Sequence, residues 1–155
     1  MTESVTFTGH RFIPYQKMEV IRDALAKAVR EHYYKGIRNF NCGMAIGFDL
    51  LAAEVVLSLK EKLTDLRLTA VVPYPHQYEK WTGKDKDRYR HLLDKSDTVI
   101  VLSRNYYKGC LLRRNDYMLS HCKGVIAYYD GTPKGGTYYT IRKARQMRLP
   151  VLNLF

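Results

Sequence analysis

The chain has 155 residues, which is enough for one domain with a real hydrophobic core and too few for two. With 46% apolar and 26% charged residues its composition is that of a soluble globular protein, and no apolar run approaches the roughly 20 residues of a membrane span. The formal net charge of +11 favours anionic partners, namely nucleotides, single-stranded nucleic acid or phosphorylated metabolites, although a solvated basic surface with no specific partner would have the same charge.

Segments with strand and helix patterns alternate along the chain. The apolar and β-branched pattern predicts strands over residues 4–8, 37–42, 66–72, 98–102, 124–129 and 151–154. Apolar residues at helical spacing predict helices over residues 16–34, from 48 to about 63, over 85–95, within 105–122 and over 138–148. Such βα units predict an α/β fold, with a mostly parallel sheet and helices on both faces.

The segment between the second strand and the next helix carries the strongest functional signal. Gly43 and Gly47 flank Met44 and Ala45 there, and glycine lets the backbone bend sharply and approach a ligand closely. The start of the helix offers free N–H groups and a partial positive charge that suit a phosphate. Asp49, in the first turn, can cap those groups or accept from a ribose hydroxyl. The spacing G-x-x-x-G-x-D matches neither the dinucleotide fingerprint nor a P-loop, so a tight turn with an ordinary cap is the alternative.

Three polar or glycine-rich loops follow predicted strands, over residues 9–11, 43–49 and 130–137. Because the carboxyl ends of parallel strands share one rim of a sheet, we expect these loops to meet there. The sequence therefore predicts a phosphate-containing ligand at this rim.

Several residues of these loops have side chains suited to an anion. Arg11 can clamp a phosphate through two parallel hydrogen bonds, and His10 can act as an acid, a base or a phosphate donor, or be structural. Asn115 lies in the middle of a predicted helix, where asparagine is disfavoured, so its side chain could point into the site, or else face solvent. The predicted ligand-binding residues are Gly9, His10, Arg11, Gly43, Met44, Ala45, Gly47, Asp49, Asn115, Asp130, Gly135, Gly136 and Thr137.

Tyrosines and arginines support a second interpretation. Eight of the thirteen tyrosines form adjacent pairs, and tyrosines near the rim could stack on bases, although most are expected to be packing residues. Arg142, Arg145 and Arg148 lie three residues apart on the last helix and form one basic face, either solvated or a contact for single-stranded nucleic acid.

The start of the chain and its cysteines bear on location. The sequence MTESVTFTGHR has no basic region followed by an apolar segment, so we expect no secretory signal. The three cysteines form no C-x-x-C or zinc-like cluster, which favours a cytoplasmic location and predicts neither a metal nor a cofactor.

Four motifs together resemble the SLOG superfamily, and within it the YpsA-like proteins of unknown function from bacteria and their phages. They are T-G-H-R at residues 8–11, G-M-A-x-G-x-D at 43–49, R-N at 114–115 and D-G-x-x-x-G-G-T at 130–137. The resemblance implies a single Rossmann-like domain over residues 1–155, a nucleotide-derived ligand at the rim and, because relatives often dimerise, a homodimer.

Members of this superfamily differ in activity. LOG-type members hydrolyse the bond between base and ribose phosphate, the DNA-processing protein A branch binds single-stranded DNA, and other members are thought to sense nucleotide signals. LOG-type enzymes carry a glutamate three residues beyond the threonine of the glycine-rich motif, where this chain has Thr140. That departure favours a sensor or sequestering module for an ADP-ribose-like or NAD-like ligand. An N-glycosidase that uses another carboxylate and a single-stranded nucleic-acid binder are the alternatives.

Overall fold

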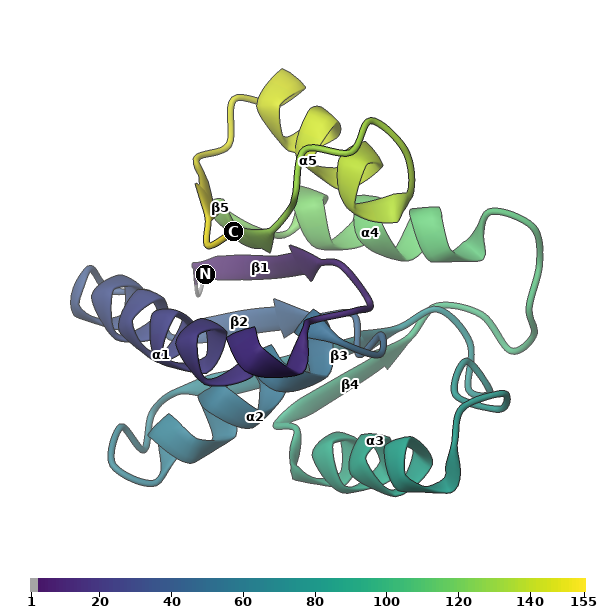
Figure 1. Ribbon diagram of the computed structural model, residues 1–155, viewed down its shortest axis with the longest axis horizontal. Helices are drawn as coiled ribbons and strands as arrows, with labels where there is room; N and C mark the ends of the chain where they lie inside the picture. Colours follow the sequence, from purple (N-terminus) through teal and green to yellow (C-terminus); the bar gives the residue numbers. More distant parts are fainter. Residues whose placement is uncertain (1–2) are drawn as a thin grey trace.

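The computed structural model describes residues 3–155, which form one sheet with helices on both of its faces (Figure 1). The strands are β1 (Ser4–Gly9), β2 (Asn39–Cys42), β3 (Arg67–Val72), β4 (Thr98–Val101), β5 (Gly124–Tyr128) and β6 (Val151–Asn153). The helices are α1 (Met18–Tyr34), α2 (Phe48–Lys60), α3 (Gly83–Lys95), α4 (Cys110–Ser120) and α5 (Gly136–Gln146), with a short 3-10 turn (Tyr15–Lys17) before α1. The predicted Rossmann-like α/β fold is confirmed.

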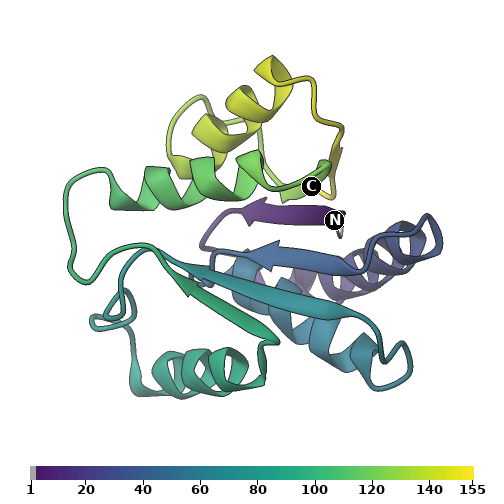
Figure 2. The same ribbon diagram turned by 180° about the vertical axis from the view of Figure 1, so that it is seen from behind.

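The sheet is parallel throughout and has the strand order β4-β3-β2-β1-β5-β6. The chain adds strands outward from β1 to β4 and then returns to place β5 on the other side of β1. Helices α1, α2 and α3 therefore cover one face, while α4 and α5 pack against each other on the opposite face (Figures 1 and 2). The order reverses between β1 and β5, and in open α/β sheets ligands bind at such a reversal.

The larger hydrophobic cluster lies between the sheet and helices α1, α2 and α3, and a smaller one lies between β5 and helices α4 and α5. On α1 the apolar residues at helical spacing face the larger cluster: Ile21, Leu25, Ala28 and Val29 are buried, and Met18 is partly buried. Helix α2 is buried on nearly every side from Phe48 onward, because it lies between α1 and α3 and directly over the sheet. Each such aliphatic side chain contributes about 1.5–3 kcal/mol when fully buried, so α2 is firmly held at the position where its first turn reaches the rim.

Helix α5 differs from its predicted start, and β4 lies at the edge of the sheet. Helix α5 begins at Gly136 instead of near 138, because a glycine in the first turn loses no hydrogen bond there and Gly135, at φ +94°, turns the chain into the helix. Strand β4 forms where a strand was predicted, and it is an exposed edge strand, with Val99 42% and Val101 49% exposed. Among residues 3–155, no helix is long and apolar enough to cross a membrane.

Candidate functional site

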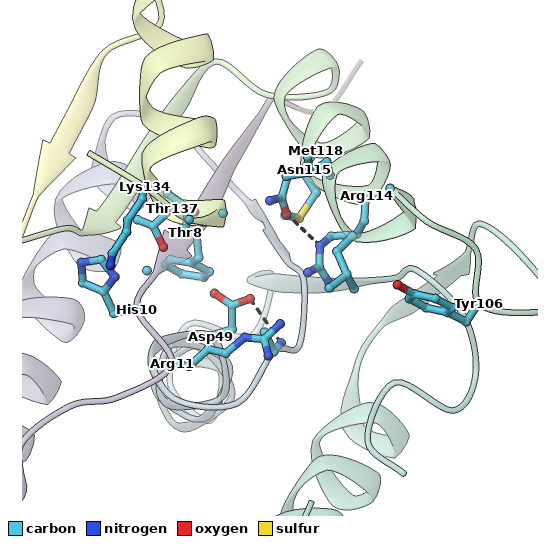
Figure 3. Close-up of a pocket in the computed structure, with 18 residues that line it drawn as sticks. Thr8, His10, Arg11, Asp49, Tyr106, Arg114, Asn115, Met118, Lys134 and Thr137 are labelled. Carbon is cyan, nitrogen blue, oxygen red and sulfur yellow. Dashed lines mark hydrogen bonds between the residues drawn. The ribbon is translucent and has the colours of Figure 1, made fainter. Parts of the chain in front are cut away.

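A cavity of about 510 Å³ opens where the order of strands reverses, at the carboxyl ends of β1 and β5. Figure 3 shows that side chains from β1 and its following turn, α2, α4 and the start of α5 converge on it. Its lining consists of Phe7, Thr8, Gly9, His10, Arg11, Ala45, Asp49, Tyr106, Gly109, Leu111, Leu112, Arg114, Asn115, Met118, Lys134, Gly135, Gly136 and Thr137.

The turn after β1 is fixed between the start of α2 and the end of β5. Gly9 lies against Phe48 so closely that an added Cβ would be 2.5 Å from the Phe48 ring. The carbonyl of His10 accepts a hydrogen bond from the Phe48 N–H at 3.1 Å, and the His10 N–H donates to the Tyr128 carbonyl at 3.2 Å. The imidazole Nε2 of His10 accepts from the Asp130 N–H at 2.9 Å and lies 3.0 Å from the Asp130 carboxylate. This wall of the cavity is therefore preorganised.

The two glycines of the central loop allow protein groups to approach one another. Gly47, at φ +89°, packs on the turn after β1, and a Cβ there would lie 2.2 Å from the Arg11 carbonyl oxygen. At Gly43 a Cβ would lie 2.8 Å from the guanidinium carbon of Arg114. Met44 between them is fully buried. The close approach expected of these glycines is thus made to Arg11 and Arg114, and none of the three loop residues lines the cavity.

Arg114 places a buried cation at the cavity wall. Its side chain is held by two hydrogen bonds, from Nη1 to the Gly43 carbonyl and from Nε to the Asn115 amide oxygen at 2.9 Å. Burial lowers the pKa of Arg114, and the nearby Asp49 carboxylate raises it. These bonds use two of the five N–H donors of the guanidinium, so it can still donate hydrogen bonds to a ligand.

Asp49 is the carboxylate of the cavity, and it is buried in the first turn of α2. Its Oδ2 accepts from the Ala45 N–H at 3.2 Å, whereas within residues 3–155 its Oδ1 has no hydrogen-bond partner. Burial raises the pKa of Asp49 to about 6, although Arg114, the Ala45 N–H and Arg11 all lower it. A buried acceptor without a donor is costly, and a ligand hydroxyl in the cavity can supply that donor.

The two ends of the cavity differ in chemistry. At one end lie Lys134 and the start of α5, where Gly135, Gly136 and the buried Thr137 offer free N–H groups and a hydroxyl (Figure 3). Tyr106 lies on the far side of Arg11 and Asp49 from this end, in the same view. Its ring is supported edge-on by Tyr74, at 5.5 Å between centroids, and is 64% exposed.

The structure gathers most of the predicted site residues in the lining but leaves four of them outside it. Gly43, Met44 and Gly47 lie behind the wall, and Asp130 faces a neighbouring recess. The prediction did not include nine residues of the lining, which are Phe7, Thr8, Tyr106, Gly109, Leu111, Leu112, Arg114, Met118 and Lys134. Arg114 could have been suspected from its place beside Asn115, and Tyr106 from its place in one of the adjacent tyrosine pairs.

Two positions with a bearing on catalysis lie outside the lining. Glu54, on α2, forms an ion pair with Arg88. Thr140 is fully buried and donates its hydroxyl hydrogen to the Gly136 carbonyl at 2.9 Å. In the part of the chain that the structure describes, no group of three or more His, Cys, Asp and Glu side chains is arranged to hold a metal ion.

Comparison with known proteins places the chain among uncharacterised relatives. A family model described as the YspA SLOG family, YpsA, matches residues 13–150. A UPF0398 protein of Halalkalibacterium halodurans is 27% identical over 146 residues, which are 92% of this chain and 75% of that protein. A UPF0398 protein of Brevibacillus brevis is 30% identical over 105 residues, 64% of this chain and 56% of that protein.

Among solved structures, DNA processing protein A from Helicobacter pylori is similar, and that structure is described for its single-stranded DNA binding mode. The TM-score is 0.70 at 17% sequence identity, and the match covers 97% of this chain and 64% of that one. At this identity the likeness establishes the shared fold alone. The chain thus spans a little under two thirds of this structural neighbour.

Proposed function

The chain belongs to the YpsA SLOG family, and from this premise we propose that its cavity binds a nucleotide or a nucleotide-derived molecule of the ADP-ribose or NAD type. The protein would act as a sensor or sequestering module for that ligand. The observation that carries the proposal is the buried Asp49 carboxylate, whose Oδ1 lacks a partner within residues 3–155 and which lies among arginine, lysine and N–H donors. A ligand with both hydroxyl and phosphate groups satisfies such a set.

The phosphate belongs at the start of α5. Free N–H groups and the partial positive charge of the helix face the cavity there, and Gly136 leaves room for an anion to reach them. Lys134 and Arg11 both line the cavity and add positive charge to it. A guanidinium can bind two phosphate oxygens at once, so Arg11 fixes the orientation of the phosphate.

The ribose and the base follow from the remaining groups. Ionised Asp49 accepts from ribose hydroxyls, as acidic residues do in other nucleotide-binding α/β folds. Tyr106 and the leucines Leu111 and Leu112 form the apolar end, where a base can stack on the open face of the tyrosine ring. Phosphate, ribose and base then lie in this order across the cavity.

The same site leaves an enzyme as a second candidate, because Asp49 has a pKa of about 6 and lines the cavity. A carboxyl group with a raised pKa is suited to general acid or base catalysis of base–ribose cleavage. Thr140 cannot replace the glutamate of the LOG-type pattern, and its hydroxyl bonds to its own helix. Release of free base from nucleotides or NAD, lost in Asp49→Asn, would establish the enzyme; binding without any released base supports the sensor.

Single-stranded nucleic acid is the third candidate. It is supported by the net charge of +11 and by the fold shared with DNA processing protein A. This candidate predicts that binding weakens steeply with salt, with a log–log slope of about −0.7 for each phosphate contacted. An affinity insensitive to salt argues against it.

A thermal-shift panel at moderate salt tests the proposal with AMP, ADP-ribose, NAD, cyclic nucleotides and a short single-stranded oligonucleotide. A ligand at about one hundred times its dissociation constant adds about 2.7 kcal/mol of stability, a rise of roughly 5–10 °C for a chain of this size. We expect one small nucleotide to give such a shift, Arg11→Ala to abolish it, and Arg30→Ala, an equal loss of charge on α1, to retain it. No shift with any small nucleotide would contradict the proposal.

A further inference from the structure

A second hollow lies directly beside the cavity, on the other side of the turn after β1. It has a volume of about 510 Å³, and His10 and Arg11 line both spaces. We call it the aromatic recess; its remaining lining is Phe12, Pro14, Lys17, Tyr128, Asp130 and Phe155. We infer that the ligand carries a second planar heteroaromatic base, which stacks in this recess. The inference rests on the proposed function, because it extends the same ligand across the turn.

The aromatic rings of the recess are placed for stacking. Phe12 is 75% exposed although it follows directly on the fixed turn. Tyr128 contacts Phe155, with ring centroids 5.3 Å apart, and its ring stacks on the buried Phe48 at 5.9 Å. The floor of the recess is therefore anchored in the core, while Phe12 and Phe155 leave ring surface open. Every base has a flat π-face, so aromatic rings can stack on any of the bases.

The charges of the recess suit a base better than a second phosphate. Asp130 borders it, and hydrogen bonds from Thr132 together with the neighbouring His10 lower the pKa of Asp130, so its carboxylate is ionised at neutral pH. A carboxylate repels phosphate but accepts hydrogen bonds from the amino groups of adenine, guanine or cytosine. Lys17, whose ammonium lies 5.2 Å from the centre of the Phe155 ring, and Arg11 can neutralise the phosphates that bridge the two bases.

Two sources share this chemistry of two bases joined through phosphate. One is a small dinucleotide such as NAD, and the other is a pair of successive nucleotides in single-stranded DNA. The test is calorimetric titration of the full chain with AMP, NAD and the 5′-phosphorylated dinucleotide d(pApA). Each ligand is titrated into the wild type, Phe12→Ala and Tyr15→Ala. Tyr15 is the matched control because it is 87% exposed and three residues away, yet does not line the recess.

We expect at least one two-base ligand to bind about tenfold more tightly than AMP, and Phe12→Ala to remove most of that gain while AMP affinity stays unchanged. Tyr15→Ala should leave all three affinities unchanged. A gain for NAD alone supports a small dinucleotide, and a gain for d(pApA) alone supports a DNA strand. The second-base inference is overturned, and the proposed function stands, if AMP binds and neither NAD nor d(pApA) binds more tightly than AMP. The same conclusion follows if Phe12→Ala weakens the binding of AMP as much as that of the two-base ligands. If none of the three binds, the second-base inference is overturned, and the proposed function falls with it only if ADP-ribose and the cyclic nucleotides also give no thermal shift.

Discussion

The ionised carboxylate of Asp49 lowers the stability of the folded protein but is the form that the proposed ligand needs. Burial raises the pKa of this carboxyl from 3.8 to about 6, so the folded protein holds an ionised group that would be better solvated in the unfolded chain. Because the folded pKa is the higher one, the penalty is absent below about pH 4, grows between pH 4 and 6, and is complete at neutral pH. One pKa unit corresponds to about 1.36 kcal/mol, so the penalty is on the order of 3 kcal/mol.

We therefore predict that Asp49→Asn is more stable than the wild type at pH 7.5, by about 1–3 kcal/mol, and that the difference vanishes near pH 4. The asparagine oxygen can still accept from the Ala45 N–H, so the loop keeps its hydrogen bond. Urea unfolding at a series of pH values measures the difference. Asp130→Asn is the control, because its pKa is lowered and loss of its charge gives no such gain. An Asp49→Asn protein that is less stable at pH 7.5 would contradict this account.

The same substitution is expected to weaken nucleotide binding, since a neutral amide is a poorer acceptor for ribose hydroxyls than a carboxylate. Loss of one charged hydrogen bond corresponds to about 1.5–3 kcal/mol, or roughly a 10- to 150-fold loss of affinity. Titration of the nucleotide that gives the thermal shift measures this. An unchanged affinity in a folded Asp49→Asn protein would show that Asp49 does not bind the ribose hydroxyls.

The loop between β2 and α2 is the element on which the site depends. It brings the turn after β1 against Gly47 and the Arg114 guanidinium against Gly43. Gly36, after α1, has a similar positive φ of +103° but nothing within 4 Å of an added Cβ. Substitutions at Gly36 and Gly47 can therefore distinguish the cost of the backbone conformation from the cost of a steric clash.

We predict that Gly36→Ala costs about 1–2 kcal/mol, the price of a left-handed conformation, whereas Gly47→Ala costs at least about 1 kcal/mol more because its methyl group meets the Arg11 backbone. Unfolding in urea compares the two variants. Gly47→Ala should also reduce nucleotide affinity, since it displaces the turn that carries His10 and Arg11. Equal stabilities for the two variants would show that the turn after β1 moves away from residue 47 at no cost in stability, and would contradict this account.

Much of the element pattern was open to prediction from the sequence. Helical spacing located the buried stripe of α1, and the three loops at the carboxyl ends of strands were expected on one rim. The exposure of β4 was not predictable, because a run of apolar β-branched residues does not reveal whether a helix covers it. Nor was the burial of Asn41 on β2, which with the partly buried Asn39 belongs to a ladder of side-chain hydrogen bonds that includes Thr69 and the His121 carbonyl.

The site was less predictable than the fold for a physical reason. Glycines signal that something approaches the backbone closely, but not whether it is a ligand or the protein itself. At Gly43 and Gly47 the partner is an arginine of this chain. The burial of Arg114 depends on how α4 packs over the sheet, and this long-range packing leaves no local trace in the sequence.

At the scale of the whole molecule, the charge of +11 draws any polyanion toward the surface, whereas the cavity selects among anions. We predict that a short single-stranded oligonucleotide, if it binds, is displaced by the small nucleotide that gives the thermal shift. Both ligands would place a phosphate at the start of α5. Fluorescence anisotropy of a labelled oligonucleotide measures the displacement at constant ionic strength. Simultaneous binding of both ligands would place the nucleic acid on another surface, such as that of Arg142 and Arg145 on α5. The third arginine of the predicted basic face, Arg148, lies beyond the end of this helix at Gln146.

The most direct test of the central claim is an NMR titration of the ¹⁵N-labelled chain with the nucleotide that gives the thermal shift. The account predicts that the largest amide shifts fall on the start of α5, at Gly135, Gly136 and Thr137, and on the turn at His10 and Arg11. Amide groups at the far end of α1 should not move. Shifts that are absent, or that cluster away from the carboxyl ends of β1 and β5, would contradict the assignment of this cavity as a nucleotide site.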